Sequence, residues 1–499
     1  MNRVQQPSRR TVLGGLAATG LLATTGTAHA GQELPERIRD IIGRPEYSGA
    51  QWGMAFYEPG RGAMIHALNQ SELFVAASSF KVFIGATAFE ALGPDRRFQT
   101  RVCRTGPLTG GVLNGDLVLV AGGDMLLSGR TGPTGKLNLP EPDHSYPGAP
   151  PLPGDSLAEI RALAAQVKAA GVRRVNGRVL MDTSLFREGR ENIALNNQTI
   201  TVSPMMVNDH IVHAVVTPGN AVGAPADVHA VPQTGHVRFV NKVITVSGTP
   251  KPLIFVDNRL TGEIQLGGPV RYVPYYVQDP APFAATVFTE ALRDRGVQVR
   301  GEACHGSRRV PVAEHTSLPL SEQAKVMLKV SSNIHTVTIP YLVGAIAGRA
   351  HDDPKASYHE FRRTLFRAAG LDADPAGSDQ DLYTADTFIK FLAHIAKRPY
   401  FRTFRLTLPI MGRDGTLAGN QPNSPAAGHV YAKTGTGYMN KTMNKALAGY
   451  IELPDGRWLT FAQFMRKGVA SMAEGIALGD QAQEAMAEIA TVVYEGSRR

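Results

Sequence analysis

Apolar and polar positions follow two different periods along the chain. They alternate at residues 52–57 and again at 63–68, on either side of a connection rich in glycine, which is typical of a β-hairpin. From residue 78 to residue 92 the apolar positions follow helical spacing, which predicts a largely buried helix that begins near Ser78. Further helices are predicted at residues 157–170, 279–295, 320–331, 335–347, 354–369, 385–398 and 472–494.

The order of the predicted elements suggests one domain interrupted by another. Strands are predicted at residues 172–182, 429–433, 445–452 and 457–465. We expect an α/β (α+β) catalytic domain made from residues 31–100 and 280–499. Residues 101–279 are expected to be inserted domains rich in β-structure, with a small β module near 224–268. Residues 128–155 are rich in glycine and proline and too long for an ordinary connector, so a mobile surface loop is favoured over part of a binding rim.

The composition fits a large folded protein. Of 499 residues, 43% are hydrophobic and 19% are charged, with 52 glycines and 33 prolines. These proportions exclude a disordered polyelectrolyte, a coiled coil and a collagen-like fibre, and the length predicts two or three domains. The formal net charge of +9 comes without long basic runs, so nucleic acid is not an expected partner.

The first thirty residues have the three parts of an export signal. Arg9 and Arg10 end a basic start, an uncharged stretch follows at residues 12–25, and an A-x-A cleavage pattern ends at Ala30. The stretch is short for crossing about 30 Å of hydrocarbon, so a cleaved signal peptide is favoured over a membrane anchor. The paired arginines agree with the twin-arginine route without excluding the ordinary one. The mature chain is expected to be exported, periplasmic or extracytoplasmic, without a stable membrane span.

Two cysteines, Cys103 and Cys304, are present. In an oxidising compartment they could form one disulfide, or each could be a separate buried thiol. Neither lies in a CxxC or a Cys/His pattern with metal-ligand spacing, so a zinc site has no support.

The first motif that can carry chemistry lies at the start of the buried helix. Ser78 and Lys81 form the only S-x-x-K of the chain. Residues three apart on a helix share a face, so the Lys81 amine is expected beside the Ser78 hydroxyl. A serine needs a base to take its proton, and burial with a second cation nearby can lower the pKa of a lysine enough for that task. Alone, the motif also fits a helix N-cap followed by a solvated lysine.

Two further motifs follow in order. Ser331 and Asn333 form the only S-x-N, between two predicted helices, and could relay a proton and orient a substrate carbonyl. Lys433 begins the only K-T-G, on a predicted strand, where a cation and hydroxyl groups could hold a carboxylate. Its glycine would let a substrate backbone approach closely. Taken singly, the two motifs also fit a turn and the end of a strand.

Together, the three motifs match the set of penicillin-binding proteins and serine β-lactamases. The chain resembles one branch of these, the class C low-molecular-mass penicillin-binding proteins, which are D-alanyl-D-alanine carboxypeptidases/endopeptidases of the penicillin-binding protein 4 type. The long interval between Ser78 and Ser331 fits the large insertion of that branch. Short strings at residues 122–124, 177–182, 408–417 and 446–450 are also similar. The resemblance implies a serine β-lactamase/transpeptidase-like domain.

The resemblance also implies a reaction. Ser78 would be acylated by the carbonyl of the penultimate D-Ala, with Lys81 as the base. Ser331 and Lys433 would complete the proton path to the departing amine, and Asn333 would hold the substrate amide.

The same resemblance implies how substrate is bound. Thr434, Gly435 and Thr436 would bind substrate, the two threonines at its terminal carboxylate, and the backbone N–H groups of Ser78 and Thr436 would form the oxyanion hole. Peptidoglycan stem peptides would be the substrates and β-lactams the inhibitors. No metal or organic cofactor would be needed.

Two other functions stay open. A β-lactamase or esterase of the same fold is one, although no glutamate for positioning a deacylating water is evident between the second and third motifs. A non-catalytic wall-binding homologue is the other, because residues 437–445 are longer than the family pattern and adjoin the catalytic strand. The balance between carboxypeptidase and endopeptidase action is also open, since both reactions cleave at a D-Ala carbonyl.

Overall fold

The computed structural model describes residues 33–132, 134–193, 198–302, 309–371 and 382–497. The predicted signal peptide and Cys304 lie outside these ranges. Cys103 is buried, and the choice between a disulfide and two separate thiols stays open. In the part of the chain that is described, none of the helices combines the length and the apolar character that a bilayer crossing requires.

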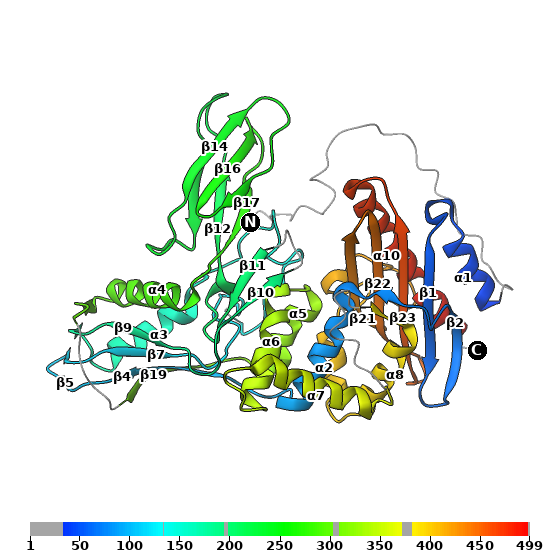
Figure 1. Cartoon of the computed structure of the whole chain (residues 1–499), viewed down its shortest axis with the longest axis horizontal. Coiled ribbons are helices and arrows are strands. Elements are labelled where there is room, and N and C mark those ends of the chain that lie inside the picture. The colour runs from blue at the N-terminus through cyan, green and yellow to red at the C-terminus, as the bar shows by residue number, and fades with distance from the viewer. Residues whose placement is uncertain (1–32, 133, 194–197, 303–308, 372–381, 498–499) are drawn as a thin grey trace.

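A five-stranded antiparallel sheet joins the two ends of the chain (Figure 1). Its order is β2-β1-β23-β22-β21. Strand β1, from the beginning of the chain, therefore lies between its hairpin partner β2 and strand β23 from the end of the chain. The strands are β1 (Gln51–Glu58), β2 (Ala63–Leu68), β21 (Val430–Met439), β22 (Thr442–Glu452) and β23 (Trp458–Gly468). The register places Ala55 of β1 opposite Ala462 of β23. The β1–β2 hairpin and the three later strands agree with the sequence pattern, and β21 lies at one edge of the sheet.

Each face of this sheet is covered by helices because its strands are apolar on both sides. On one face α1 (Leu34–Ile42) and α10 (Met472–Gly496) share a core with the sheet. The other face packs against α8 (Ala385–Ile395), and behind it lies α2 (Lys81–Leu92). The ring of Phe83, on α2, contacts four other aromatic rings and is fully buried.

A group of helices surrounds α2 and separates the sheet from the insertion (Figure 1). It consists of α5 (Leu320–Lys329), α6 (Asn333–Ile346), α7 (Pro354–Ala368) and α9 (Phe401–Thr407). The short strands β3 (Phe74–Val75) and β20 (Leu382–Tyr383) pair beside them. Every long helix expected from periodicity is present, with ends that differ by a few residues.

The insertion has a core of its own. Two four-stranded sheets, ordered β19-β4-β7-β9 and β18-β8-β6-β5, lie with α3 and α4 around it. Their bounds are β4 (Gln99–Arg104), β5 (Leu108–Thr109), β6 (Val112–Leu113), β7 (Leu117–Val120), α3 (Ala158–Ala169), β8 (Arg174–Val175), β9 (Val179–Asp182), α4 (Pro280–Asp294), β18 (Gln298–Val299) and β19 (Val310–Thr316).

Smaller sheets complete the insertion. One of them, ordered β14-β16-β15, projects from the body of the molecule over a separate small core (Figure 1). The strands are β10 (Gly189–Ile193), β11 (Gln198–Val202), β12 (Ile211–Thr217), β13 (Asp227–Val231), β14 (Val240–Val246), β15 (Ile254–Val256), β16 (Arg259–Gln265) and β17 (Arg271–Tyr276).

The end of the insertion differs from the expected boundary at residue 279. Helix α4 packs on α3 inside the insertion core, β18 pairs with β8, and β19 pairs with β4. Periodicity identifies a helix but not the partner on which it packs. The sequence pattern alone therefore places residues 280–316 in the catalytic domain. We propose that the inserted domains span residues 101–316.

Truncating Phe83 is expected to test how much the aromatic cluster stabilises α2. Phe83→Ala should lower the free energy of unfolding by about 3–5 kcal/mol, because the site is fully buried and leaves a cavity. The control Leu73→Ala should change it by less than about 0.5 kcal/mol, since that side chain is 52% exposed. Urea unfolding measures both, and equal effects would contradict this view of the core.

Candidate active site

Ser78 lies in a short 3-10 helix that continues into α2. This turn, η3 (Ala77–Phe80), begins with a left-handed residue, since Ala77 has φ +42°. The neighbouring Ser79 fixes the turn by donating from Oγ to the carbonyl oxygen of Ala76 at 2.7 Å. Ser78 itself is half-buried, whereas Lys81 is almost completely buried. The structure therefore keeps both S-x-x-K residues on consecutive helical turns, with the serine accessible.

Lys81 reaches across to the second motif. Its Nζ donates to Ser331 O at 2.7 Å, to Ser331 Oγ at 3.1 Å and to Asn333 Oδ1 at 2.7 Å. Burial, and then the positive charge of Lys433, hold the pKa of Lys81 well below its ordinary range, against a smaller opposing effect of Asp143. This shift favours the neutral amine, which is the form of a lysine that can accept a proton.

Lys433 approaches the same hydroxyl from the sheet. Its Nζ donates to Ser331 Oγ at 3.0 Å and to Thr434 O at 2.9 Å. Burial lowers the pKa of Lys433 to about 7; Glu141 opposes this and Lys445 adds to it. One hydroxyl oxygen has two lone pairs, so Ser331 Oγ can accept from both lysines. Ser331 thus joins the first and third motifs.

The segment between α5 and α6 holds Ser331 in an uncommon conformation. Ser331 has φ +60°, a left-handed value that a side chain with a Cβ adopts at some cost. The next residue, Ser332, is held by hydrogen bonds through both its hydroxyl and its backbone carbonyl. Ser332 Oγ lies 3.0 Å from His335 Nδ1, and the Ser332 carbonyl accepts from Thr336 Oγ1 at 2.7 Å. Rigid neighbours therefore keep the strained serine turned toward the two lysines.

Gly435 lets the third motif pack directly on the turn that carries Ser78. A Cβ at Gly435 would lie 2.4 Å from Ala76 O and 3.1 Å from Ser79 N. The sequence suggested that this glycine admits a substrate backbone. The structure gives a different reason for the missing side chain, because the close approach is made by the backbone of the protein itself.

The two threonines of the third motif differ in their surroundings. Thr434 is buried and its Oγ1 lies 2.8 Å from Thr416 Oγ1, in the short helix η5 (Gly415–Leu417). Thr436 is exposed, and its Oγ1 accepts from Lys445 Nζ at 2.7 Å. Both belong to the edge strand, where an extended substrate can lie alongside.

Residues 437–445, which raised doubt about the catalytic strand, extend the hairpin in regular register. Strands β21 and β22 stay paired as far as Met439 opposite Thr442. Asn440 and Lys441 make the turn, with φ values of +50° and +57°, as a two-residue type I′ connection requires. The extra length therefore leaves the pairing of Thr436 unchanged.

The favoured interpretation of residues 128–155 as a mobile surface loop is wrong, because part of this segment is packed against the site. Tyr146 donates from its hydroxyl to Ser331 O at 2.9 Å. Nearby, Arg130 and Asp143 are fully buried and form an ion pair at 2.7 Å. Sequence reasoning missed these residues because glycine and proline indicate only a connector. The tyrosine and the charged residues among them were the available signal.

Asp143, His144 and Asp209 are the described residues whose side chains come close enough together to hold a metal ion. Arg130 already lies among them, with Nη2 hydrogen-bonded to both carboxylates and Nε 3.0 Å from Asp209 Oδ2. The guanidinium supplies the positive charge that a metal would bring. We therefore assign no metal to this cluster, which supports the loop that carries Tyr146.

Nearly the whole described chain is similar to proteins of one peptidase family. The model of the D-Ala-D-Ala carboxypeptidase 3 (S13) family matches residues 34–492. The chain belongs to this family. The predicted enzyme class, a serine-type D-Ala-D-Ala carboxypeptidase and hence a hydrolase, is confirmed. The chain is 29% identical over 484 residues to a D-alanyl-D-alanine carboxypeptidase of Actinomadura sp. (strain R39), an alignment that covers 88% of this chain and 82% of the relative.

Solved structures of similar fold include a penicillin-binding protein. Penicillin binding protein 4 (dacB) from Haemophilus influenzae matches with a TM-score of 0.70 at 20% identity, covering 93% of this chain and 99% of that chain. Its complex with a β-lactam matches with a TM-score of 0.65 at 20% identity, covering 90% and 99%. The predicted mixed α/β fold is confirmed by this likeness.

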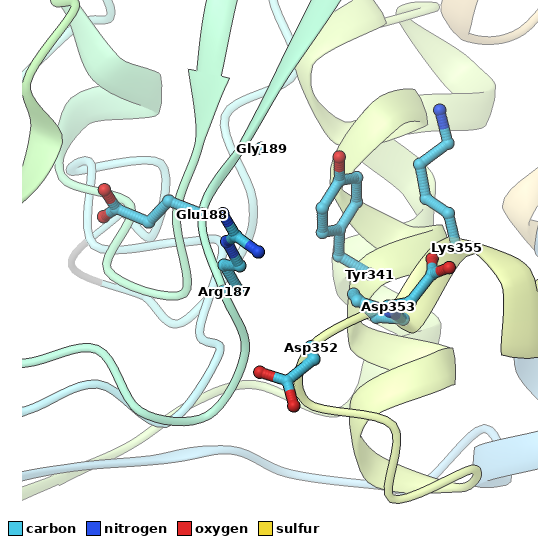
Figure 2. Close-up of a pocket in the computed structure, with 8 residues that line it drawn as sticks. Arg187, Glu188, Gly189, Tyr341, Asp352, Asp353 and Lys355 are labelled. Atoms are coloured by element: carbon cyan, nitrogen blue, oxygen red, sulfur yellow. The ribbon is translucent and has the colours of Figure 1, made fainter.

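A separate hollow of about 280 Å³ lies between the insertion and helices α6 and α7 (Figure 2). Its lining residues are Arg187, Glu188, Gly189, Tyr341, Asp352, Asp353, Pro354 and Lys355. No residue of the three motifs is among those that line it. Helix α6 links the hollow to the second motif, because it carries Asn333 at its start and Tyr341 further along.

Gly435→Ala is expected to slow release of D-Ala from a D-Ala-D-Ala peptide by about 100-fold, because the new Cβ must push β21 away from the Ser78 turn. Gly437→Ala is the matched control on the same strand. Its Cβ would meet only Ala77 Cβ, at 3.5 Å, so its rate should stay within about threefold. Similar rates for the two variants would contradict the packing described for Gly435.

Proposed function

We propose that the chain is an exported serine DD-peptidase that cleaves the D-Ala-D-Ala bond of peptidoglycan stem peptides through an acyl-enzyme on Ser78. The observation that carries this proposal is that Lys81 and Lys433 both donate to Ser331 Oγ, beside the turn of Ser78. Such an arrangement offers a nucleophile, a lysine able to act as base and a hydroxyl that can pass a proton.

In the proposed acylation, neutral Lys81 takes the proton of Ser78 Oγ. The oxygen attacks the carbonyl carbon of the penultimate D-Ala, and the bond from that carbon to the terminal nitrogen then breaks. The departing amine receives a proton through Ser331 Oγ, which both lysines contact. The backbone N–H groups of Ser78 and Thr436 would hold the oxygen that becomes negative.

In the proposed deacylation, water attacks the ester carbon and Ser78 recovers its proton, which releases the shortened peptide. Cross-linked peptides that present the same D-Ala carbonyl would be cleaved by the same steps. Asn333 would hold the substrate amide, and the hydroxyls of Thr434 and Thr436 the terminal carboxylate. β-Lactams carry a carboxylate and a strained amide, so they would acylate Ser78 in the same way. The predicted export signal at residues 1–30 supports a place of action outside the cytoplasm.

Fluorescent penicillin tests the nucleophile and separates the three functions. The mature chain should label stably and release D-Ala from a D-Ala-D-Ala muropeptide, and Ser78→Ala should lose both activities. Ser79→Ala is the matched neighbour and should still label, although more slowly, because it loses a hydrogen bond within the turn but keeps the Ser78 nucleophile.

The other outcomes identify the alternatives. Labelling followed by rapid loss of the label, without release of D-Ala, would indicate a β-lactamase. A folded chain that neither labels nor releases D-Ala would indicate a wall-binding homologue. Either result would overturn the proposal.

Acylation of Ser78 is expected to fall as the pH is lowered through the pKa of Lys81, because protonated Lys81 cannot take the serine proton. Lys433 lowers the pKa of Lys81, so Lys433→Met should raise that pKa and move the acidic limb to higher pH by about one unit. The second-order rate of labelling by fluorescent penicillin from about pH 5 to 9 measures the shift. The exposed control Lys242→Met should leave the limb in place. An unchanged limb in Lys433→Met would contradict the coupling.

A further inference from the structure

A third buried lysine lies beside the third motif. Lys445 is on β22, directly opposite Thr436 of β21, and is 3% exposed. Its Nζ donates to Thr436 Oγ1 at 2.7 Å. It belongs to residues 437–445, which the three motifs leave without a function. The two-residue turn at Asn440 and Lys441 returns the chain so that this lysine faces the exposed threonine.

This hydrogen bond determines where the Thr436 hydroxyl can donate. An ammonium group has donors and no acceptor, so the oxygen of Thr436 must accept from Lys445. A hydroxyl has a single hydrogen, and here it is left to donate away from the lysine. Since Thr436 is exposed on the edge strand, that direction includes the side on which a substrate can bind.

Lys445 also supplies charge that the threonines lack. A hydroxyl donates to a carboxylate without neutralising its charge, whereas a neighbouring ammonium group also offsets that charge by Coulomb attraction. Lys81 and Lys433 are both engaged with Ser331, where they serve proton transfer.

We propose that Lys445 is a positioning residue for the terminal carboxylate of the substrate: it turns the Thr436 hydroxyl toward that group and supplies the neighbouring positive charge. This inference rests on the proposed function, in which Thr434 and Thr436 line the carboxylate site. It assigns to Lys445 the preference of the enzyme for peptides that end in a carboxylate. The chemistry of the amide cleavage itself stays with Ser78 and Lys81.

The test compares two substrates that differ only at the end. One is an N-acylated tripeptide ending in D-Ala-D-Ala with a free carboxylate, and the other is the same peptide with a terminal carboxamide. The ratio of kcat/KM for the two measures the preference. Lys445→Met should lower this ratio by about 10- to 100-fold, the loss expected for one charge-assisted interaction. Its rate on the carboxamide should change by less than about threefold.

A second variant covers the case in which Lys445→Met does not fold. Lys445→Gln keeps a donor for Thr436 Oγ1 but removes the charge, so it should lower the ratio by about tenfold. Lys242→Met, an exposed lysine on the projecting sheet, is the control and should keep the wild-type ratio.

The interaction with Thr436 is tested by the double variant. If Lys445 acts through the hydroxyl, Thr436→Val alone should lower the ratio. The double variant should then lower the wild-type ratio by less than the product of the two single-variant reductions. An unchanged ratio in folded Lys445→Met or Lys445→Gln would overturn the inference while the wild type still releases D-Ala. A wild type that releases no D-Ala would instead overturn the proposed function.

Discussion

The hydroxyl of Ser331 lies between two buried ammonium groups, and the rest of the site depends on this arrangement. Lys81 and Lys433 both donate to its Oγ, at 3.1 Å and 3.0 Å. Two buried lysines that lie close together do not both keep their ordinary pKa, because burial and mutual repulsion disfavour the charged forms. The pKa of each is lowered, first by burial. A lysine must be neutral to take the proton of a serine, and here the packing of three distant segments favours that form.

The fold holds those segments at the required separation. The turn of Ser78 lies against the catalytic strand because Gly435 has no side chain there. The insertion takes part as well, although it is far from the motifs in sequence. Tyr146 donates to the carbonyl of Ser331, and Asp143, held by Arg130, partly offsets the fall in the pKa of Lys81. Removing the insertion would therefore remove part of the active-site wall.

Short-range patterns predicted most elements and the three motifs, whereas partners in space were harder to predict. Helical spacing located α2, and the three motifs indicated the family, because each of these signals lies within a short run of consecutive residues. The partner of α4 was missed, since an apolar face does not say which core it joins. Tyr146 was missed because a segment rich in glycine and proline indicates a connector and does not show that one of its side chains contacts the site. Lys445 was named only as part of an overlong segment, and its role depends on cross-strand register.

The most direct test of the account is the protonation of Lys81 itself. The mature chain with ¹⁵N-labelled lysine side chains would be titrated by NMR, and the Lys81 signal would be assigned by its loss in Lys81→Arg. The account predicts that Lys81 titrates well below the ordinary pKa of a lysine side chain. A Lys81 that keeps its proton throughout the neutral range and titrates together with the exposed lysines would contradict it.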